Sequence, residues 1–403
     1  MNSPKGIEIS AFDYPLPNER IAKFPLEQRD HSKLLVCRHG VIEESQFFHI
    51  GEKLPQNAMI VMNNTKVIHA RLFFRKPTGS MIEVFCLEPW QMPVAQSFEE
   101  RERCTWMCFI GNNKKWKDAP LDREITINGE SVRLTARRRE PVGNAWIVDF
   151  EWTGGHSFAE IIDQAGVIPL PPYLHREAED SDNDRYQTVY ARHEGSVAAP
   201  TAGLHFTPEV FEDLKSRGID TEFITLHVGA GTFKPVSTVT IGEHEMHVEK
   251  VEISLSNIER ILEHMGSPII SVGTTTVRTL ESLYWFGVKL GQNPDLQNMN
   301  VLQWDPYELE ELGVGPQESY RNILDWMKRN EMTQLEGETQ LMIAPGYRYH
   351  IINGIITNFH QPKSTLLLLV SALIGDKWKE CYQYALDNGF RFLSYGDSCL
   401  FIP

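Results

Sequence analysis

The stretch PIISVGTTTVRTLESLYWFG, residues 268–287, decides the fold class, because two hydrophobic patterns meet in it. The run from Pro268 to Val272 is short and apolar, which is typical of a buried strand. Gly273 and the threonines after it predict a loop that leads into a helix. Elsewhere the chain keeps alternating, as where Thr207-Pro208 opens a helix that leads to the strand IDTEFITL (219–226). This alternation predicts an α/β domain with a mixed sheet and flanking helices.

The segment RYHIINGIITNF, residues 348–359, predicts a β-hairpin. Asn353 and Gly354 stand between two β-rich runs, and the Asn-Gly pair favours the type I′ turn of a two-residue hairpin loop. Beyond this hairpin, we expect Ser364 to cap an apolar helix, and we expect FRFLSYGDSCLFI (390–402) to end the fold as a strand.

Residues 70–150 have a different texture from the rest of the chain. Short β-like runs such as MIEVFCLE and NAWIVDFEW alternate with turn signals, which predicts a small antiparallel barrel or sandwich. We therefore expect an inserted all-β barrel domain at 70–150, within a discontinuous α/β catalytic domain formed by 1–69 and 151–403. The acidic run 177–184 and the polar segment 287–340 are expected to be surface insertions. The segment 287–340 is expected to bury little except through the helix SYRNILDWMKRN (319–330).

The charge distribution is uneven. The formal net charge of −15 argues against a general nucleic-acid binder, because phosphate contacts need lysine and arginine. Residues 71–150 nevertheless hold 13 lysines and arginines against 11 acids, a local charge of +2 that leaves −17 for the rest. These cations could be solvated strand faces, or they could form a local phosphate-contact surface on an acidic protein.

Neither a membrane span nor a disulfide framework is expected. The longest apolar run near the C-terminus, Leu366 to Leu373, is far shorter than the ~20 residues that cross a bilayer. The N-terminal residues show no signal-peptide pattern, so we expect a cytoplasmic protein. The six cysteines are scattered, which favours reduced and mostly buried thiols.

Four segments combine glycine, threonine, histidine and a charge at places where strands should end. They are APTAGLHFT (199–207), TLHVGAGTFKPV (225–236), SVGTTTVRTLES (271–282) and ITNFHQPKSTLL (356–367). In α/β proteins, ligands gather outside the carboxyl ends of the strands. The small residues would allow a ligand to approach the backbone closely, and the imidazoles and hydroxyls would supply hydrogen bonds.

The GAG of HVGAGTFKPV (227–236) is not a dinucleotide-binding loop. Such a loop must lead into a helix, and Pro235 disfavours the helical conformation for Lys234. The glycines can instead leave room for a ligand. In the third segment, the turn before the helix offers free amides to a carboxylate or a nucleotide hydroxyl, unless it is only a helix cap. Arg278 and Glu281 are three apart and share a helix face there.

Two other chemistries are not supported. His244, Glu245 and His247 suggest a metal site, but the two histidines are three apart rather than four, so we expect no metal. A Ser-His-Asp hydrolase is not indicated either, because the chain has no G-x-S-x-G elbow.

Together these motifs resemble the S-adenosylmethionine:tRNA ribosyltransferase-isomerase family of the queuosine pathway. The similar segments follow one another in order along almost the whole chain: 13–36, 63–72, 170–173, 185–191, 198–207, 225–236, 243–249, 272–282, 345–375 and 390–402. The resemblance implies transfer and isomerisation of the ribosyl part of S-adenosylmethionine onto the aminomethyl group of a 7-deazaguanine base in tRNA. Adenine and methionine would be released and epoxyqueuosine formed.

The resemblance also implies the requirements of the site. The reaction needs a base for the acidic proton beside the sulfonium, support for the departure of adenine, and exclusion of water. It implies adenosylmethionine as a co-substrate with no true cofactor and no metal, and tRNA as the partner. We also expect no membrane association and a monomer. Similar proteins have an α/β main domain with an inserted β-barrel, which agrees with the inserted all-β domain predicted at 70–150.

Motif position and chemistry predict the roles of individual residues. His205 and His227 are candidates for proton transfer, because imidazole titrates near neutral pH, and Asp397 is a further catalytic candidate. The candidates for adenosylmethionine contacts are Gly229, Gly231, Thr232, Phe233, Gly273, Thr274, Thr275, Arg278, Glu281, Asn358, His360, Lys363 and Tyr395. The candidates for tRNA phosphate contacts are Arg71, Lys114 and Lys115.

One motif departs from the family pattern. Where the family usually reads N-D-T-R-V-I-P-A-R-L, this chain has NNTKVIHARL, with Asn64 for an acid, Lys66 for an arginine and His69 for a proline. A carboxylate absent at position 64 removes a possible base or cation partner. Two alternatives therefore remain: the same type of pocket acting on another acceptor, or a non-catalytic RNA-binding protein.

Overall fold

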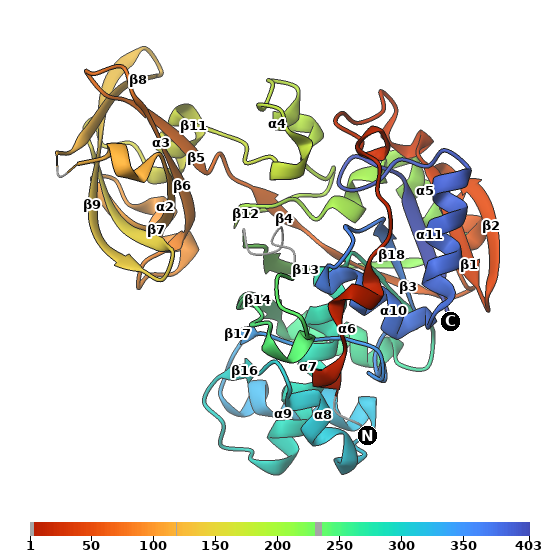
Figure 1. The fold of residues 1–403 in the computed structure, drawn as a ribbon. Coiled ribbons are helices and arrows are strands. Elements are labelled where there is room, and N and C mark those ends of the chain that lie inside the picture. Colours follow the sequence, from red (N-terminus) through yellow and green to blue (C-terminus); the bar gives the residue numbers. More distant parts are fainter. Residues whose placement is uncertain (1–3, 118, 230–235) are drawn as a thin grey trace. The chain divides into compact units, whose positions relative to one another are not determined.

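The computed structural model describes residues 4–117, 119–229 and 236–403. The chain divides into two compact units, each described here by itself. Unit 1 comprises the residues up to 64, residues 188–191 and the residues from 200 onward, and unit 2 comprises 65–187 and 192–199. The segment 70–150 lies entirely within unit 2 (Figure 1).

The described residues of unit 1 form a ten-stranded sheet. Its strands are β1 (Lys33–Arg38), β2 (Val41–Gln46), β3 (Met59–Asn63), β13 (Asp220–His227), β14 (Glu249–Ser254), β15 (Ile269–Val272), β16 (Met299–Val301), β17 (Gln334–Thr339), β18 (Gly354–Asn358) and β19 (Ser398–Ile402). Their spatial order is β16-β17-β14-β13-β3-β15-β18-β19-β1-β2. The central strands β13, β3, β15 and β18 run parallel, whereas β14 and β19 are antiparallel to their neighbours β13 and β18. The predicted mixed sheet is therefore confirmed.

Helices cover both faces of this sheet, which explains why β3, β15, β18 and β19 are buried at every residue. The helices of unit 1 are α1 (Ile50–Lys53), α5 (Pro208–Ser216), α6 (Leu255–His264), α7 (Thr274–Gln292), α8 (Asp305–Leu309), α9 (Pro316–Arg329), α10 (Thr365–Ile374) and α11 (Lys377–Asp387). Residues of α1 and α5 share one core cluster with alternate residues of the central strands. Helix α7 begins at Thr274, so the predicted loop before it shrinks to Gly273.

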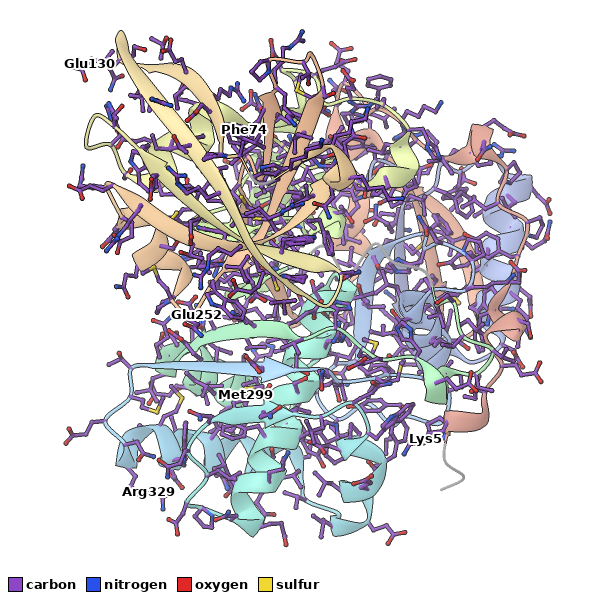
Figure 2. The ribbon with its side chains drawn as sticks, turned by 60° about the vertical axis from the view of Figure 1, so that its left-hand side comes forward. Lys5, Phe74, Glu130, Glu252, Met299 and Arg329 are labelled. Atoms are coloured by element: carbon purple, nitrogen blue, oxygen red, sulfur yellow. The ribbon has the colours of Figure 1, made fainter. Side chains whose placement is uncertain are left out.

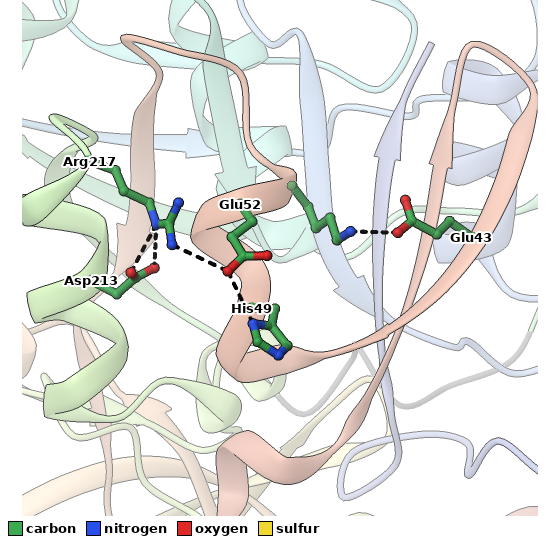
Figure 3. Close-up of polar contacts among 6 residues, drawn as sticks. Glu43, His49, Glu52, Asp213 and Arg217 are labelled. Carbon is green, nitrogen blue, oxygen red and sulfur yellow. Dashed lines mark hydrogen bonds and ion pairs between the residues drawn. The ribbon is translucent and has the colours of Figure 1, made fainter.

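The predicted helix starts are confirmed. Thr207 accepts a hydrogen bond from the amide of Val210, and Pro208 occupies the first position of α5. Ser364 caps α10 in the same way. Figure 3 shows how Arg217, at the end of α5, binds both Asp213 of its own helix and Glu52 of α1. These exposed ion pairs join the two helices over the shared core.

The predicted hairpin at 348–359 is wrong. Residues 348–352 form no strand, because the buried carboxylate of Glu281 accepts hydrogen bonds from the amides of His350, Ile351 and Ile352. Asn353 pairs with Ile269 instead: its amide donates to the Ile269 carbonyl, and its side-chain oxygen accepts from the Ile269 amide. The Asn-Gly pair therefore starts the parallel strand β18 beside β15.

Outside the predicted helix at 319–330, the segment 287–340 buries more than expected. Helix α7 continues to Gln292, and β16 and β17 extend the sheet at one edge. The predicted helix is α9, and it buries Tyr320, Ile323, Trp326 and Met327, as expected. Its apolar residues follow helical spacing, and this spacing places them on the face that packs against α7.

Unit 2 contains a curled antiparallel sheet of seven strands among its described residues (Figure 1). Its elements are β4 (Thr65–Val67), β5 (Arg71–Arg75), β6 (Met81–Pro89), β7 (Arg103–Gly111), β8 (Leu121–Ile127), β9 (Glu130–Val142), β10 (Ala145–Trp152), β11 (Gly166–Val167), β12 (His193–Ser196), α2 (Val94–Glu99), α3 (Phe158–Ala165) and α4 (Asp182–Arg185). The sheet order is β11-β5-β6-β7-β10-β9-β8, while β4 and β12 form a separate parallel pair. Phe158 of α3 packs against the rings of Phe98, Trp106, Phe150 and Trp152.

Two sequence expectations concern the chain as a whole. All six cysteines are free and buried, as predicted. Among the described residues, no helix has both the length and the apolar composition needed to cross a bilayer.

Candidate functional site

The carboxyl ends of the parallel strands meet at one edge of the unit 1 sheet. His227 ends β13, Gly273 follows β15, and Asn358 ends β18. Because these strands and β3 are parallel, the segments predicted to carry chemistry lie at the same edge. The segment 199–207 joins them through Thr201 and His205. These five residues are called the strand-end cluster below.

Hydrogen bonds hold the middle of the strand-end cluster. Thr201 and His205 lie on the short 3₁₀ helix η8 (Thr201–His205). Thr201 Oγ1 donates to Asn358 Oδ1 at 3.1 Å, and Asn358 Nδ2 donates to His205 Nε2 at 3.1 Å. The other ring nitrogen of His205 is 2.9 Å from Ser32 Oγ. Asn358 therefore binds both groups of η8 at once, and Ser32 completes the chain of hydrogen bonds.

His205 does not have the near-neutral titration that was expected of it. Burial lowers the pKa of His205 to about 4, and burial lowers the pKa of His360 to about 3. Both rings therefore stay uncharged at neutral pH. His360 is hydrogen-bonded to Thr357 Oγ1 at 3.0 Å, and its carbonyl accepts from Tyr14. Both histidines act as buried hydrogen-bonding groups.

Acid is expected to destabilise the protein partly through His205. The unfolded imidazole titrates near 6.5, so between about pH 6.5 and 4 the unfolded state binds more protons, and stability falls as the pH falls. This loss of stability is absent well above pH 6.5 and amounts to about 2 kcal/mol at pH 5. Urea unfolding at pH 7.5 and 5 should show a smaller acid loss for His205→Gln than for wild type. The half-buried His264→Gln should match wild type, and equal losses in all three proteins would contradict this prediction.

His227 has a different environment from His205. Its side chain is 15% exposed, and its Nε2 lies 3.5 Å from the Glu252 carboxylate on the neighbouring strand β14. Glu252 stands opposite Thr225 in the antiparallel register, and it is labelled in Figure 2. A carboxylate beside an imidazole orients the ring for proton transfer. Of the two candidate histidines, His227 is therefore better suited to accept a proton.

Arg278 is buried and pairs with Glu249, not with Glu281 as their shared helix face suggested. Arg278 Nη1 lies 2.9 Å from Glu249 Oε2, and Arg278 Nε donates to the Leu341 carbonyl at 3.1 Å. His247 Nε2 lies 3.1 Å from the other Glu249 oxygen. Burial raises the pKa of Glu249, but Arg278 and His247 more than offset this, so the net pKa is below its ordinary value.

The carboxylates of Glu281 and Asp397 hold the backbone in place. Glu281 accepts from three amides and from the hydroxyl of Tyr347 at 2.8 Å. Asp397 accepts from the amides of Lys33 at 2.9 Å and Arg391 at 2.7 Å. Burial raises the pKa of Asp397, while Arg391 and Lys33 oppose this effect. Both carboxylates thus already have hydrogen-bond partners within the protein.

The candidate binding residues at the start of α7 are buried, and their backbone conformation and amides suit a ligand. Gly273 has φ +87° and ψ 150°, a conformation that residues with a Cβ rarely adopt. Thr274 and Thr275 form the first turn, where free amides and the helix dipole favour a negative or hydrogen-bond-accepting group. At Gly229, a Cβ would meet no described atom within 4 Å. The predicted contacts at 231–233 lie outside the described residues.

The remaining candidates lie at or near the same edge. Tyr395 is buried just before Asp397 and β19. Lys363 is half-exposed, and its Nζ lies 2.7 Å from Asp13 Oδ2. Lys363 therefore has a carboxylate partner at the surface.

Each departure from the family motif has a local partner. Asn64 Oδ1 accepts from Thr225 Oγ1 at 2.8 Å, a bond that a carboxylate could also accept. Lys66 pairs with Glu194 at 2.8 Å, and His69 lies 3.1 Å from Asp163. Asn64 therefore keeps the acceptor of the usual acid but not its charge.

The candidate phosphate contacts differ in availability. Arg71 lies 3.1 Å from Glu83, its Nη2 donates to the Leu170 carbonyl, and its guanidinium lies over the ring of Phe85. Lys114 and Lys115 are exposed on the 3₁₀ helix η6 (Asn113–Lys115). The lysines fit a phosphate surface, whereas Arg71 is engaged within unit 2.

Sequence reasoning missed Ser32, Glu249 and Glu252. Within the described parts of the chain, no three histidine, cysteine or acidic side chains are grouped to hold a metal ion. His247, once a metal candidate, binds Glu249 instead. Alternation along VEKVEIS predicts that Glu249 and Glu252 lie on a strand. Nothing in the sequence predicts that Glu249 pairs with Arg278 or that Glu252 lies beside His227.

Comparisons with known proteins give one consistent family. A family model described as queuosine biosynthesis protein matches residues 9–401. The chain is 36% identical over 395 residues to a protein of Pelobacter propionicus and 37% identical over 402 residues to one of Halothermothrix orenii. The alignments cover 97% and 98% of this chain and 98% and 100% of the relatives, both named S-adenosylmethionine:tRNA ribosyltransferase-isomerase. A crystal structure of S-adenosylmethionine tRNA ribosyltransferase from Thermotoga maritima is 27% identical, with a TM-score of 0.46 over 98% of this chain and all of that one.

Proposed function

This chain belongs to the queuosine biosynthesis protein family, and we propose that the family's reaction takes place at its strand-end cluster. The enzyme transfers and isomerises the ribosyl moiety of S-adenosylmethionine onto the 7-aminomethyl-7-deazaguanine base of tRNA. The products are epoxyqueuosine in tRNA, adenine and methionine. Adenosylmethionine is consumed as a co-substrate, and the family indicates no cofactor.

The observation that carries the proposed location is the meeting of His227, Gly273 and Asn358 at one sheet edge. The glycine allows a ligand to approach the backbone, and the first amides of α7 offer hydrogen bonds. Asn358 is held by Thr201 and His205, so its orientation is set before a substrate arrives. We assign the adenosylmethionine contacts to Gly229, Gly273, Thr274, Thr275, Asn358 and Tyr395.

His227 is assigned the role of general base. It would accept the acidic proton of the carbon beside the sulfonium, and Glu252 would stabilise the resulting imidazolium. His205, whose pKa burial lowers to about 4, orients Asn358 instead. Asp397, Glu281 and Arg278 support the backbone around the site, since each is already bound within the protein.

The domain organisation is part of the same proposal. We propose a catalytic domain within 1–69 and 151–403 and an inserted β-barrel that contains 70–150 and contributes to tRNA binding. The helix α3 and the strand β11, which belong to unit 2, are added to this inserted domain. The curled sheet and its exposed lysines support this assignment. We expect the enzyme to act as a monomer in the cytoplasm, where its tRNA substrate is available.

Product analysis tests this function. The protein is incubated with S-adenosylmethionine and tRNA that carries the aminomethyl-deazaguanine base, and the digested nucleosides are examined by mass spectrometry. We expect epoxyqueuosine, with adenine and methionine released in equal amounts. A folded protein that yields neither epoxyqueuosine nor adenine would overturn the proposal.

A further inference from the structure

Six basic residues gather around the short helix η6 of unit 2. They form the η6 basic cluster: Arg75, Lys76, Lys114, Lys115, Lys117 and Arg138. They come from separate parts of the sequence, namely the end of β5, η6 with the residues that follow it, and the middle of β9. The cluster is therefore produced by the fold and is not a simple run of charges.

Direct contacts tie the parts of the cluster together. Lys76 Nζ donates to the Lys115 carbonyl at 2.8 Å. Arg138 donates to the side chain of Asn113, the first residue of η6. The Arg138 guanidinium also lies 4.4 Å from the ring centre of Trp146 and 5.6 Å from that of Trp116. The end of β5, the helix η6 and the middle of β9 are therefore neighbours in space.

The cluster has no carboxylate partners among the described residues of the chain, which leave out position 118. Four other arginines of the same sheet are paired with carboxylates: Arg71 with Glu83, Arg133 with Asp122, Arg137 with Glu151, and Arg139 with Asp149. On a chain with 54 acids and 39 lysines and arginines, acids are plentiful enough to pair every cation. Within the described part of the chain, these six cations have no such partner and form a local field of positive sign.

A plain solvated surface is the simplest alternative explanation for this cluster. Two features favour a polyanion over that explanation. The cations repel one another where they are gathered, and a bound anion removes that repulsion. The guanidinium of Arg138 is held over an aromatic ring and by Asn113, so its charge adds to the cluster at a fixed position.

We propose that the η6 basic cluster binds the phosphate backbone of the tRNA substrate. This inference rests on the proposed function, which supplies tRNA as the polyanion. Beyond the proposed function, the inference names the lysines and arginines that bind the RNA. It excludes Arg71, because the Arg71 guanidinium already contacts Glu83, the Leu170 carbonyl and Phe85. Phosphate contacts position an RNA without reading its sequence, so the cluster orients the tRNA and leaves base recognition to other residues.

The double variant Lys114→Ala/Lys115→Ala tests this surface, because both side chains are exposed and their loss should not affect folding. Binding of unmodified tRNA transcript is measured across a range of salt concentrations. The loss of two phosphate contacts should weaken binding roughly 10- to 30-fold at 0.15 M salt and make the slope of log K against log salt less steep by about 1.5. The KM for adenosylmethionine should stay at the wild-type value.

The matched control is Arg133→Ala/Arg137→Ala, which removes the same charge from ion-paired positions of the same sheet. It should bind tRNA with the wild-type slope. An unchanged slope in the lysine variant, or an equal change in both variants, would overturn the proposal. One further outcome would overturn the proposal. In it, the lysine variant keeps the wild-type slope for tRNA, and an acidic peptide competes with tRNA in the wild type but not in the variant.

The design separates this proposal from the proposed function. If wild-type protein binds tRNA but forms no epoxyqueuosine, the proposed reaction is wrong. The comparison of salt slopes then still shows whether the η6 basic cluster binds tRNA. If product forms at equal rates and equal salt dependence in wild type and lysine variant, the reaction stands and the surface is wrong.

Discussion

Replacing Arg278 with alanine is expected to lower the free energy of unfolding by about 3–5 kcal/mol. The substitution leaves the carboxylate of Glu249 buried and without its cationic partner, since Glu249 is 1% exposed and its Oε2 lies 2.9 Å from Arg278. The remaining contact from His247 reaches only the other oxygen. Urea unfolding monitored by far-UV circular dichroism measures the loss.

Two further variants give this prediction a control and a second test. Arg217→Ala removes an arginine from an exposed pair with Asp213 (Figure 3), and it should cost less than about 1 kcal/mol. Arg278→Met/Glu249→Met removes both buried charges, and it should recover most of the stability lost in the single variant. If Arg278→Ala proves no more damaging than Arg217→Ala, the buried pair is not what holds this part of the fold.

The second large effect concerns turnover. His227→Asn is expected to lower kcat by about 100-fold or more, because general bases contribute roughly 10²–10⁴-fold to the rates of such steps. Since the side chain is partly exposed and contacts Glu252 at 3.5 Å, the fold should survive the change. Single-turnover measurements with saturating tRNA and adenosylmethionine separate this loss from weaker binding.

The control for His227 lies at the opposite edge of the sheet. His264 ends α6, and its Nε2 is 3.0 Å from the Asn57 carbonyl, two residues before β3 begins. His264→Asn should keep the wild-type kcat, while Glu252→Gln should show a smaller loss than His227→Asn. Turnover of His227→Asn within about threefold of wild type would remove this histidine from the mechanism, since a general base contributes more than that.

Local signals in the sequence predict much of the fold. The Thr207-Pro208 start of α5 and the Ser364 cap of α10 depend on residues a few positions apart, and both are confirmed. Buried strands such as β15 and β3 appear as apolar runs because helices cover both sheet faces. The convergence of the site segments was also predictable, because parallel strands end at one edge.

The failures share a physical cause, which is long-range hydrogen bonding. The Asn-Gly signal at 353–354 predicted a hairpin, but Glu281, far away in sequence, bonds the amides that the first strand would have used. Arg278 has Glu281 on its own helix face, yet it pairs with Glu249 of β14. Local spacing cannot show which of two carboxylates a buried guanidinium will meet.

The candidate site shows the same limit. Sequence alone could not rank His205 and His227, because each lies in a glycine-containing or strand-end motif. Burial separates them: it lowers the pKa of His205 to about 4, while His227 keeps partial exposure beside Glu252. For Asp397, we propose a backbone-anchoring role for the same kind of reason, since the Lys33 and Arg391 amides bind its oxygens.

Amide hydrogen exchange, measured with and without S-adenosylmethionine, tests most directly whether the substrate binds at the strand-end cluster. Binding there should slow exchange in the peptides that cover 201–205, 226–229, 273–276 and 356–360. The helix α9 (Pro316–Arg329), which lies outside the cluster, should exchange at an unchanged rate. Protection confined to other segments, with none in these four, would place adenosylmethionine elsewhere and contradict the assignment of the site.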